Sequence, residues 1–323
     1  MKKILSFIIA CILCISTAGC GNQTATDGTQ PEAAESQAAE SQAAESQAAK
    51  AQESYASARI SYLGPEGTYT QEACNKFFDM QGSLTPCETV GDAVAALVSG
   101  ECDYAVIPQE NTIGGPVIDY VDTVIGQTGV SVVGEVELLI SQNLLAAPGS
   151  SVNDIKTVYS HKQGIAQGKE WLSENVPDAE VIEVSSTAEG AKMVSEADDP
   201  SLAAIASAGC ADVYGLQILA ADIQNNDNNK TRFYVLSMKE PGAADGERLA
   251  FIAAGDAENL PGLMADMEEL EMELVAIHDR PMKTELGEYY YLVECEDAGY
   301  ESYQKLTEKS SFEFRYLGSF DVR

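Results

Sequence analysis

The residues with the clearest chemical potential are Thr231 and Arg232, which open an apolar run at positions 233–236. A threonine hydroxyl can donate a proton to a leaving oxygen, and a guanidinium can hold a carboxylate. A lone Thr-Arg-Phe tripeptide is more often ordinary strand sequence. Its weight here comes from four groups of polar residues that precede it, each placed where a predicted strand ends or a predicted helix begins.

Two of these groups lie in the first half of the sequence. A Gly-Pro-Glu-Gly turn at 64–67 leads into a predicted helix that starts at Thr68, with a glutamine three residues later, as in a capping box. The free backbone N–H groups of such a helix start can hold an anion. Glu110 and Asn111 follow a strand that we expect Pro108 to end, and they can bind hydroxyl or carboxylate groups. Both groups also fit plainer roles, as a capped helix start and as turn residues.

The other two groups lie further along the chain. Ser160 is expected to cap a helix at 163–174, on which Gln167 lies one turn from the start. Ser186 and Thr187 place hydroxyls at the start of another predicted helix, where simple capping is the plainer interpretation. The sequence shows no obvious Ser-His-Asp arrangement, which disfavours a hydrolase.

The elements that must position these residues alternate along the chain. From 59 to 238, short strand-like runs alternate with helical patterns, which predicts an α/β fold with parallel or mixed sheets covered by helices. Two such blocks, joined by a long segment at 133–146 within the β-rich stretch 130–146, predict two lobes with a cleft between them. After a linker at 239–247, the order of predicted elements over 248–323 is βαββαβ, a ferredoxin-like arrangement.

The first 58 residues are not part of the predicted fold. Two lysines, an apolar segment at 4–15 and a run of small residues ending in Cys20 are typical of a lipoprotein signal peptide over 1–20. A lipid on Cys20 would anchor the protein outside the bacterial cell membrane without spanning it, although simple secretion or a retained anchor stays open. The repeat Ala-Glu-Ser-Gln-Ala lacks large apolar residues, so 21–58 is predicted to be a polar tether.

The composition limits the partners. The chain has 323 residues and a net charge of -32 at pH 7. This charge repels nucleic acid and anionic membrane surfaces, so neither is expected to bind, and a pocket for an anionic substrate must build local positive potential. The 8 cysteines and 2 histidines lack the spacing of a metal site. A histidine-rich zinc site is therefore not expected.

Taken together, these residues resemble the prephenate dehydratase family. The resemblance runs from about residue 60 to 237. It includes Tyr-Leu-Gly-Pro-Glu-Gly-Thr at 62–68, Asp-Tyr-Ala-Val-Ile-Pro at 103–108, Val-Tyr-Ser-His at 158–161, Ser-Ser-Thr-Ala-Glu at 185–189 and Asn-Asn-Lys-Thr-Arg-Phe at 228–233. It implies a two-lobed catalytic domain similar to type II periplasmic binding proteins over 59–238. The segment 248–323 looks like the ACT regulatory domain that usually follows.

The resemblance implies a reaction in phenylalanine biosynthesis, in which prephenate loses carbon dioxide and water to give phenylpyruvate. Aromatisation of the ring drives this reaction, so the enzyme must orient the substrate and protonate the leaving hydroxyl. The family assigns the proton donor to Thr231, and the resemblance implies that no metal or organic cofactor is needed. Its binding residues carry over to Asn111, Ser160 and Gln167, with Glu110, Ser186 and Thr187 as close neighbours. We also expect the helix starts near Thr68 and Ser186, together with Arg232, to hold the two carboxylates.

The C-terminal segment departs from the ACT pattern at both effector motifs. Gly262 and Leu263 stand in a Pro-Gly-Leu where the family has Gly-Ala-Leu. Arg280 and Pro281 end a His-Asp-Arg-Pro where it has Glu-Ser-Arg-Pro. We therefore expect the ACT fold but not normal binding of L-phenylalanine as effector. Because the family is usually dimeric or tetrameric, a homodimer or homotetramer is expected.

Two other functions stay open. Arogenate, which carries an amino group in the side chain of prephenate, is an alternative substrate. A non-catalytic solute-binding lipoprotein would share the two lobes and the lipid anchor. A proton-donating threonine in the company of Asn111, Ser160 and Gln167 favours the enzyme, because a receptor needs no such acid.

Overall fold

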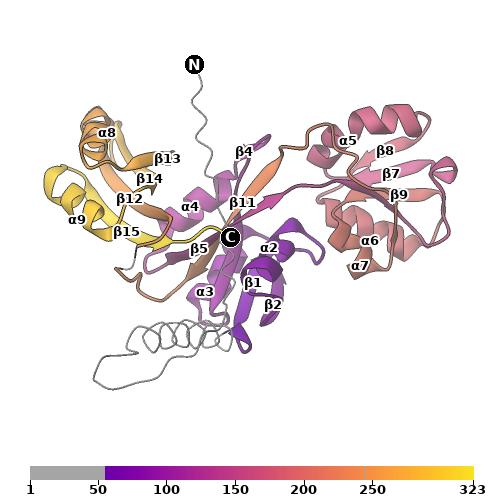
Figure 1. Ribbon diagram of the computed structural model, residues 1–323, viewed down its shortest axis with the longest axis horizontal. Coiled ribbons are helices and arrows are strands. Elements are labelled where there is room, and N and C mark those ends of the chain that lie inside the picture. Colours follow the sequence, from indigo (N-terminus) through magenta and orange to yellow (C-terminus); the bar gives the residue numbers. More distant parts are fainter. Residues whose placement is uncertain (1–54, 244) are drawn as a thin grey trace, which may run out of the picture. The chain divides into compact units, whose positions relative to one another are not determined.

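The computed structural model describes residues 55–243 and 245–323 (Figure 1). The predicted signal peptide with Cys20, and the tether up to residue 54, lie outside the described residues. The last residues of the predicted tether belong to the fold, because the ring of Tyr55 lies 5.0 Å from that of Phe78 and Ala58 is buried. Within 55–243 and 245–323, no helix is long and apolar enough to cross a membrane.

The first lobe is a mixed sheet with helices on both faces. Its strands run in the order β2-β1-β3-β11-β5; β1 is parallel to β2 and β3, whereas β11 is antiparallel to both of its neighbours. Helices α3 and α4 pack into the core on one face and α2 into the core on the other. The elements are β1 (Arg59–Leu63), α2 (Tyr69–Phe77), β2 (Ser83–Cys87), α3 (Val90–Val98), β3 (Tyr104–Asn111), β4 (Gly115–Pro116), α4 (Ile118–Gly126), β5 (Ser131–Leu139) and β11 (Lys230–Ser237).

The second lobe is inserted between β5 and β11. Its sheet has the order β10-β6-β9-β7-β8, with α5 on one face and α6 and α7 on the other (Figure 1). Its elements are β6 (Asn143–Ala146), η1 (Val152–Asp154), β7 (Thr157–Ser160), α5 (Lys162–Asn175), β8 (Glu180–Glu183), α6 (Thr187–Ala197), β9 (Leu202–Ala206), α7 (Ala208–Tyr214) and β10 (Gln217–Ala220). The chain therefore crosses between the lobes twice, after β5 and before β11.

The C-terminal segment has the predicted βαββαβ order. Its antiparallel sheet runs β13-β14-β12-β15, and α8 and α9 share one core on one face of it (Figure 1). The elements are β12 (Arg248–Asp256), η2 (Ala257–Asn259), α8 (Leu260–Glu269), β13 (Glu273–Pro281), β14 (Glu288–Glu296), α9 (Tyr300–Lys309) and β15 (Glu313–Phe320).

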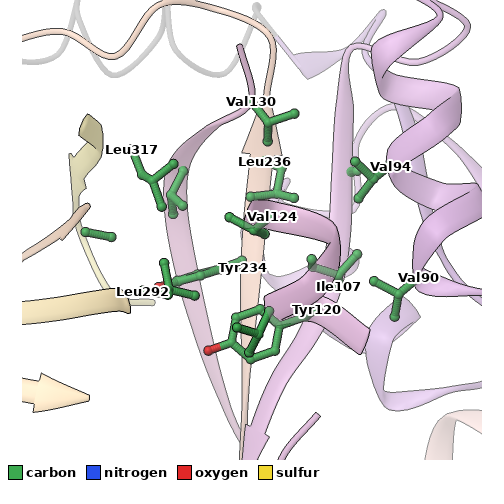
Figure 2. Close-up of a cluster of buried hydrophobic side chains, with 14 of the residues drawn as sticks. Val90, Val94, Ile107, Tyr120, Val124, Val130, Tyr234, Leu236, Leu292 and Leu317 are labelled. Atoms are coloured by element: carbon green, nitrogen blue, oxygen red, sulfur yellow. The ribbon is translucent and has the colours of Figure 1, made fainter. Parts of the chain in front are cut away.

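The other face of this C-terminal sheet joins the core of the first lobe. Leu292 of β14 and Leu317 of β15 are fully buried in one cluster with Tyr234 and Leu236 of β11 (Figure 2). Burying one such leucine contributes about 1.5–3 kcal/mol. The C-terminal sheet is thus part of the support for β11.

Two local predictions are wrong. Pro108 does not end its strand, because β3 continues to Asn111. Phe233 pairs with Pro108 and Arg232 with Glu110, so Gln109 is an extra residue in a bulge, where a proline without an N–H is tolerated. Ser160 does not cap α5, because His161 is the N-cap and its ring nitrogen Nδ1 accepts a hydrogen bond from the backbone N–H of Gln163 at 3.4 Å.

Candidate active site

A pocket of about 510 Å³ is lined by residues of both lobes. It lies where β3, β11 and the starts of α2, α5 and α6 come together. Six of the residues that the sequence singled out line it, and they come from five separate elements or their caps: Thr68, Asn111, Gln167, Ser186, Thr187 and Thr231. The fold therefore brings most of the predicted site into one cavity.

Thr231 is joined to Asn111 by strand pairing and by a side-chain hydrogen bond. The two residues are direct partners in the antiparallel pair of β11 and β3, and Asn111 Nδ2 donates to Thr231 Oγ1 at 2.9 Å. The backbone N–H groups of Ile113 and Gly114 donate to Asn111 Oδ1 at 3.0 and 2.8 Å, which fixes the orientation of this amide. Thr231 Oγ1 accordingly accepts one hydrogen bond and keeps its own hydrogen available for a ligand.

A hydrogen bond donated to a hydroxyl oxygen favours loss of the proton from that hydroxyl. As an alcohol gives up its proton, negative charge develops on the oxygen, and a donor already aimed at that oxygen stabilises the charge. Asn111 places such a donor at Thr231 from a fixed position.

Strand β11 and the residue before it present every second side chain to the pocket. Asn229, Thr231 and Phe233 line it, as expected for a period of two. Asn229 was not predicted as a site residue. Its position two residues before Thr231 would have placed it on the same face of the strand. Its side-chain oxygen accepts hydrogen bonds from Asn111 Nδ2 at 2.8 Å and from Thr112 Oγ1 at 3.2 Å.

The same alternation explains why Arg232 does not reach the pocket. Its guanidinium points to the other side of the sheet, where it pairs with Glu135 (2.7 Å), Glu110 (3.3 Å) and Glu294 of β14. Burial acts to lower the pKa of Arg232, but the bond to Glu135 and the charge of Glu294 outweigh burial and keep the pKa above its usual value. The expectation that Arg232 holds a substrate carboxylate is therefore not supported by the structure.

Glu110 and Ser160 also lie outside the pocket lining. Glu110 faces Arg232 on the far side of β3, one position before the pocket-lining Asn111. Ser160 is fully buried, and its hydroxyl donates to the carbonyl oxygen of Ile205 at 2.7 Å. Both residues support the site from behind instead of lining it.

Three helix N-termini supply the positive potential. Thr68 caps α2 by accepting from the N–H of Gln71, and Ser186 caps α6 by accepting from the N–H of Glu189. The first-turn amides beyond these caps have no helical acceptor, and each helix start carries a partial positive charge. None of the described residues that line the pocket is Lys, Arg, Asp or Glu. Thr68 and Ser186 can therefore cap their helices while the remaining first-turn N–H groups stay available to an anion.

The second-lobe wall of the pocket is formed by amides and a histidine. Gln142 Nε2 donates to Gln167 Oε1 at 2.9 Å, and both side chains are buried. Gln142 was not singled out from the sequence. His161 also lines the pocket; burial lowers its pKa, with a smaller opposing effect from Glu183. Burial thus favours the neutral form of the His161 imidazole.

Contacts between the lobes hold the cavity together. Gly67 has a positive φ of 83°, and its carbonyl oxygen accepts from Ser207 Oγ and from Cys210 Sγ of α7, both at 3.0 Å. Tyr214 donates to the carbonyl oxygen of Glu66 at 2.7 Å. The turn before α2 is thereby fixed to the second lobe.

The residues at the expected effector positions do not meet this pocket. Leu263 is buried in the C-terminal core, and Gly262 precedes it on α8. Arg280 Nε donates to Asp122 of α4 at 2.7 Å, while Pro281 ends β13. The side chain of Leu263 thus packs in the core, and that of Arg280 binds Asp122.

Comparison with known proteins gives a consistent result. Residues 60–241 match the sequence profile of the family described as prephenate dehydratase. The bifunctional chorismate mutase/prephenate dehydratase of Neisseria gonorrhoeae is 36% identical over 268 residues, covering 81% of this chain and 74% of that protein. The prephenate dehydratase of Mycolicibacterium gilvum is 34% identical, over 80% of this chain and 90% of that one.

A solved structure also resembles this fold. The prephenate dehydratase of Arthrobacter aurescens in complex with L-Phe superposes with a TM-score of 0.72 at 27% identity, over 81% of this chain and 90% of that one. The profile match and the curated relatives cover both lobes of the pocket. The chain therefore belongs to the prephenate dehydratase family.

Proposed function

We propose that the pocket between the lobes converts prephenate into phenylpyruvate, carbon dioxide and water, with Thr231 as the proton donor. Membership of the prephenate dehydratase family supports the reaction. The hydrogen bond from Asn111 to Thr231 Oγ1 is the single observation that supports the role of Thr231, because it leaves the hydroxyl hydrogen free and stabilises the oxygen that loses it.

The reaction needs only one proton transfer from the enzyme. The hydroxyl of Thr231 gives its proton to the ring hydroxyl, and the ring C–O bond breaks to release water. The electron pair of the bond between the ring carbon and its carboxylate moves into the ring, so that carbon dioxide leaves and the ring becomes aromatic. The threonine oxygen then regains a proton from solvent. Such general acid catalysis contributes about 10²–10⁴-fold to a rate.

An uncharged pocket suits a substrate that loses a carboxylate. An arginine on that carboxylate would stabilise the ground state more than the transition state, in which its negative charge moves into the ring, and would slow the reaction. Helix N-termini and hydroxyls carry less charge than an arginine, so they bind a dianion with less stabilisation of the ground state. The starts of α2, α5 and α6 are the groups that we propose for the two carboxylates.

The test is phenylpyruvate formation by the purified protein. Thr231→Val keeps the shape and the strand preference of the side chain but removes the hydroxyl, so kcat should fall about 10²–10⁴-fold. Thr85→Val, at an exposed position on β2, is the matched control and should keep full activity. Equal rates for wild type and Thr231→Val would remove the proton-donor role. Arogenate in the same assay decides between the two substrates, and binding without turnover in the wild type would indicate a solute-binding protein.

The C-terminal βαββαβ segment is proposed to be an ACT-like domain that no longer responds normally to L-phenylalanine. The departures at 261–263 and 278–281 support this proposal, as does the pairing of Arg280 with Asp122. Titration with L-phenylalanine should leave both the rate and the melting temperature unchanged. A shift in either would show that an effector site persists.

Two further proposals rest on the sequence. We propose that the chain is exported and lipid-anchored through Cys20, and that it assembles as a homodimer or homotetramer. Expression with an alkyne-labelled fatty acid should label the wild type but not Cys20→Ser. Analytical ultracentrifugation of the protein should give the mass of a dimer or tetramer, and a monomer mass would contradict the assembly proposal.

A further inference from the structure

We propose that Asn229 donates a hydrogen bond to the departing hydroxyl oxygen of the substrate and so acts beside Thr231 as a second group on the leaving oxygen. The inference rests on the proposed reaction and adds a residue to it. Three observations carry it: the orientation of the Asn229 amide, the burial of its nitrogen and its connection to Thr231.

The orientation follows from an unbroken chain of hydrogen bonds. Two backbone N–H groups donate to Asn111 Oδ1, so Nδ2 of that residue must be the donor toward Asn229. Asn229 Oδ1 receives this bond at 2.8 Å and a second one from Thr112 Oγ1 at 3.2 Å. With its oxygen turned toward these donors, Asn229 has Nδ2, which carries two hydrogens, at the other end of its amide.

That nitrogen is buried without a partner among the described residues. Asn229 is 1% exposed, and its Nδ2 has no hydrogen-bond acceptor there, although the residue lines the pocket. A buried donor that lacks an acceptor destabilises the protein, because its lost hydrogen bond to water is not replaced. The N–H of Ile140 donates to the Asn229 carbonyl oxygen at 2.8 Å, which fixes the backbone, and the bond from Asn111 to Oδ1 holds the side chain. A ligand in the pocket would satisfy this donor.

The position of Asn229 points to the leaving oxygen instead of a carboxylate. Asn229 Oδ1 and Thr231 Oγ1 lie 2.8 and 2.9 Å from the same nitrogen of Asn111, so both side chains serve one small region of the pocket. An oxygen that takes the proton of Thr231 therefore lies in that region. As its bond to the ring breaks, that oxygen gains negative charge, and a fixed N–H donor stabilises it. Asn229 transfers no proton; the oxygen leaves as water with the proton from Thr231.

Asn229→Asp is the decisive variant, because it keeps the oxygen that Asn111 and Thr112 bind while it removes both N–H donors. Losing one preorganised donor typically lowers kcat about 10²–10³-fold. Phenylpyruvate lacks the departing hydroxyl, so its inhibition constant should change little. Activity should recover as the pH is lowered, since a protonated carboxyl regains one donor; the enzyme-free rate is subtracted at each pH. Asn228→Asp, on the exposed neighbour, is the control for added charge and should behave as wild type.

The outcomes separate this inference from its alternatives. A lower kcat with unchanged affinity for phenylpyruvate and an unchanged melting temperature supports it. A parallel loss of phenylpyruvate affinity assigns Asn229 to a carboxylate and overturns it, as does an unchanged kcat. A fall in melting temperature that accounts for the lost activity also overturns it, in favour of a structural role. An inactive wild type would instead refute the proposed reaction.

Discussion

Ser160 lies behind the pocket, where its side chain links two strands of the second lobe. Its hydroxyl is buried and donates to the carbonyl oxygen of Ile205, so β7 and β9 are linked behind the pocket. We predict that Ser160→Ala lowers the free energy of unfolding by about 1–3 kcal/mol, because the carbonyl of Ile205 loses its partner. Urea unfolding measures this loss. The KM for prephenate should stay near the wild-type value; a raised KM with unchanged stability would restore Ser160 to the substrate-binding residues.

The 2 histidines of the chain give stability a dependence on pH. Burial lowers the pKa of His161 and of His278, so each folded-state pKa lies below the ordinary value of about 6.5. Below that value the unfolded chain binds more protons than the folded one, and stability falls as the pH falls. The stabilisation is complete above about pH 6.5 and is lost as the pH drops through the folded-state pKa values.

His161→Asn tests this dependence, since asparagine is also a good N-cap. Urea midpoints measured from about pH 5 to 8 should depend less on pH in the variant, with similar midpoints at the alkaline end. A slope identical to that of the wild type would mean that His161 does not take part in the transition.

Strand β11 has two faces with different functions. The face with Thr231 lines the pocket, while Arg232 on the opposite face binds Glu294 of β14 and Glu135 of β5. Glu294 is fully buried; burial raises its pKa, and Arg232 opposes this shift. The ion pair therefore connects the C-terminal sheet to the neighbour of the proposed acid.

We predict that Glu294→Ala destabilises the protein by about 3–5 kcal/mol, because it leaves a buried guanidinium short of one partner. Glu296→Ala is the matched control: the residue lies on the same strand and also pairs with an arginine, Arg248, but its side chain is 45% exposed. Its loss should cost about 0–1 kcal/mol. Thermal unfolding of both variants measures the difference, and equal costs would contradict the importance of burial.

The alternation of β11 also shows what the sequence could reveal. Because alternate side chains of a strand face opposite sides of the sheet, Asn229 lies on the face of Thr231 and Arg232 on the other face. This rule, applied to the sequence, would have removed Arg232 from the predicted site and added Asn229. The order of elements was predictable from local patterns, as the βαββαβ segment confirms. The bulge at Gln109 and the pairing of Arg232 with Glu294 were not, because they depend on register and on contacts between residues far apart in the sequence.

The acidic side chains that the structure describes do not line the pocket that we propose for an anionic substrate. The net charge is -32, yet the pocket is lined by polar and apolar residues and by helix starts instead of acidic side chains. Two packed contacts keep this arrangement in place. One is the shared core of the C-terminal sheet and the first lobe, and the other is the attachment of the turn at 64–67 to α7.

The attachment at Gly67 has a practical consequence. Cys210 is fully buried, and burial raises the pKa of its thiol to about 11, so an alkylating reagent meets neither an accessible nor an ionised sulfur. Alkylation of Cys210 should therefore require an opening that exposes its sulfur, and we predict that this opening begins with the release of Gly67 from α7. Mass spectrometry of the peptide that contains Cys210 would measure the rate of alkylation, and phenylpyruvate in the cavity should slow it.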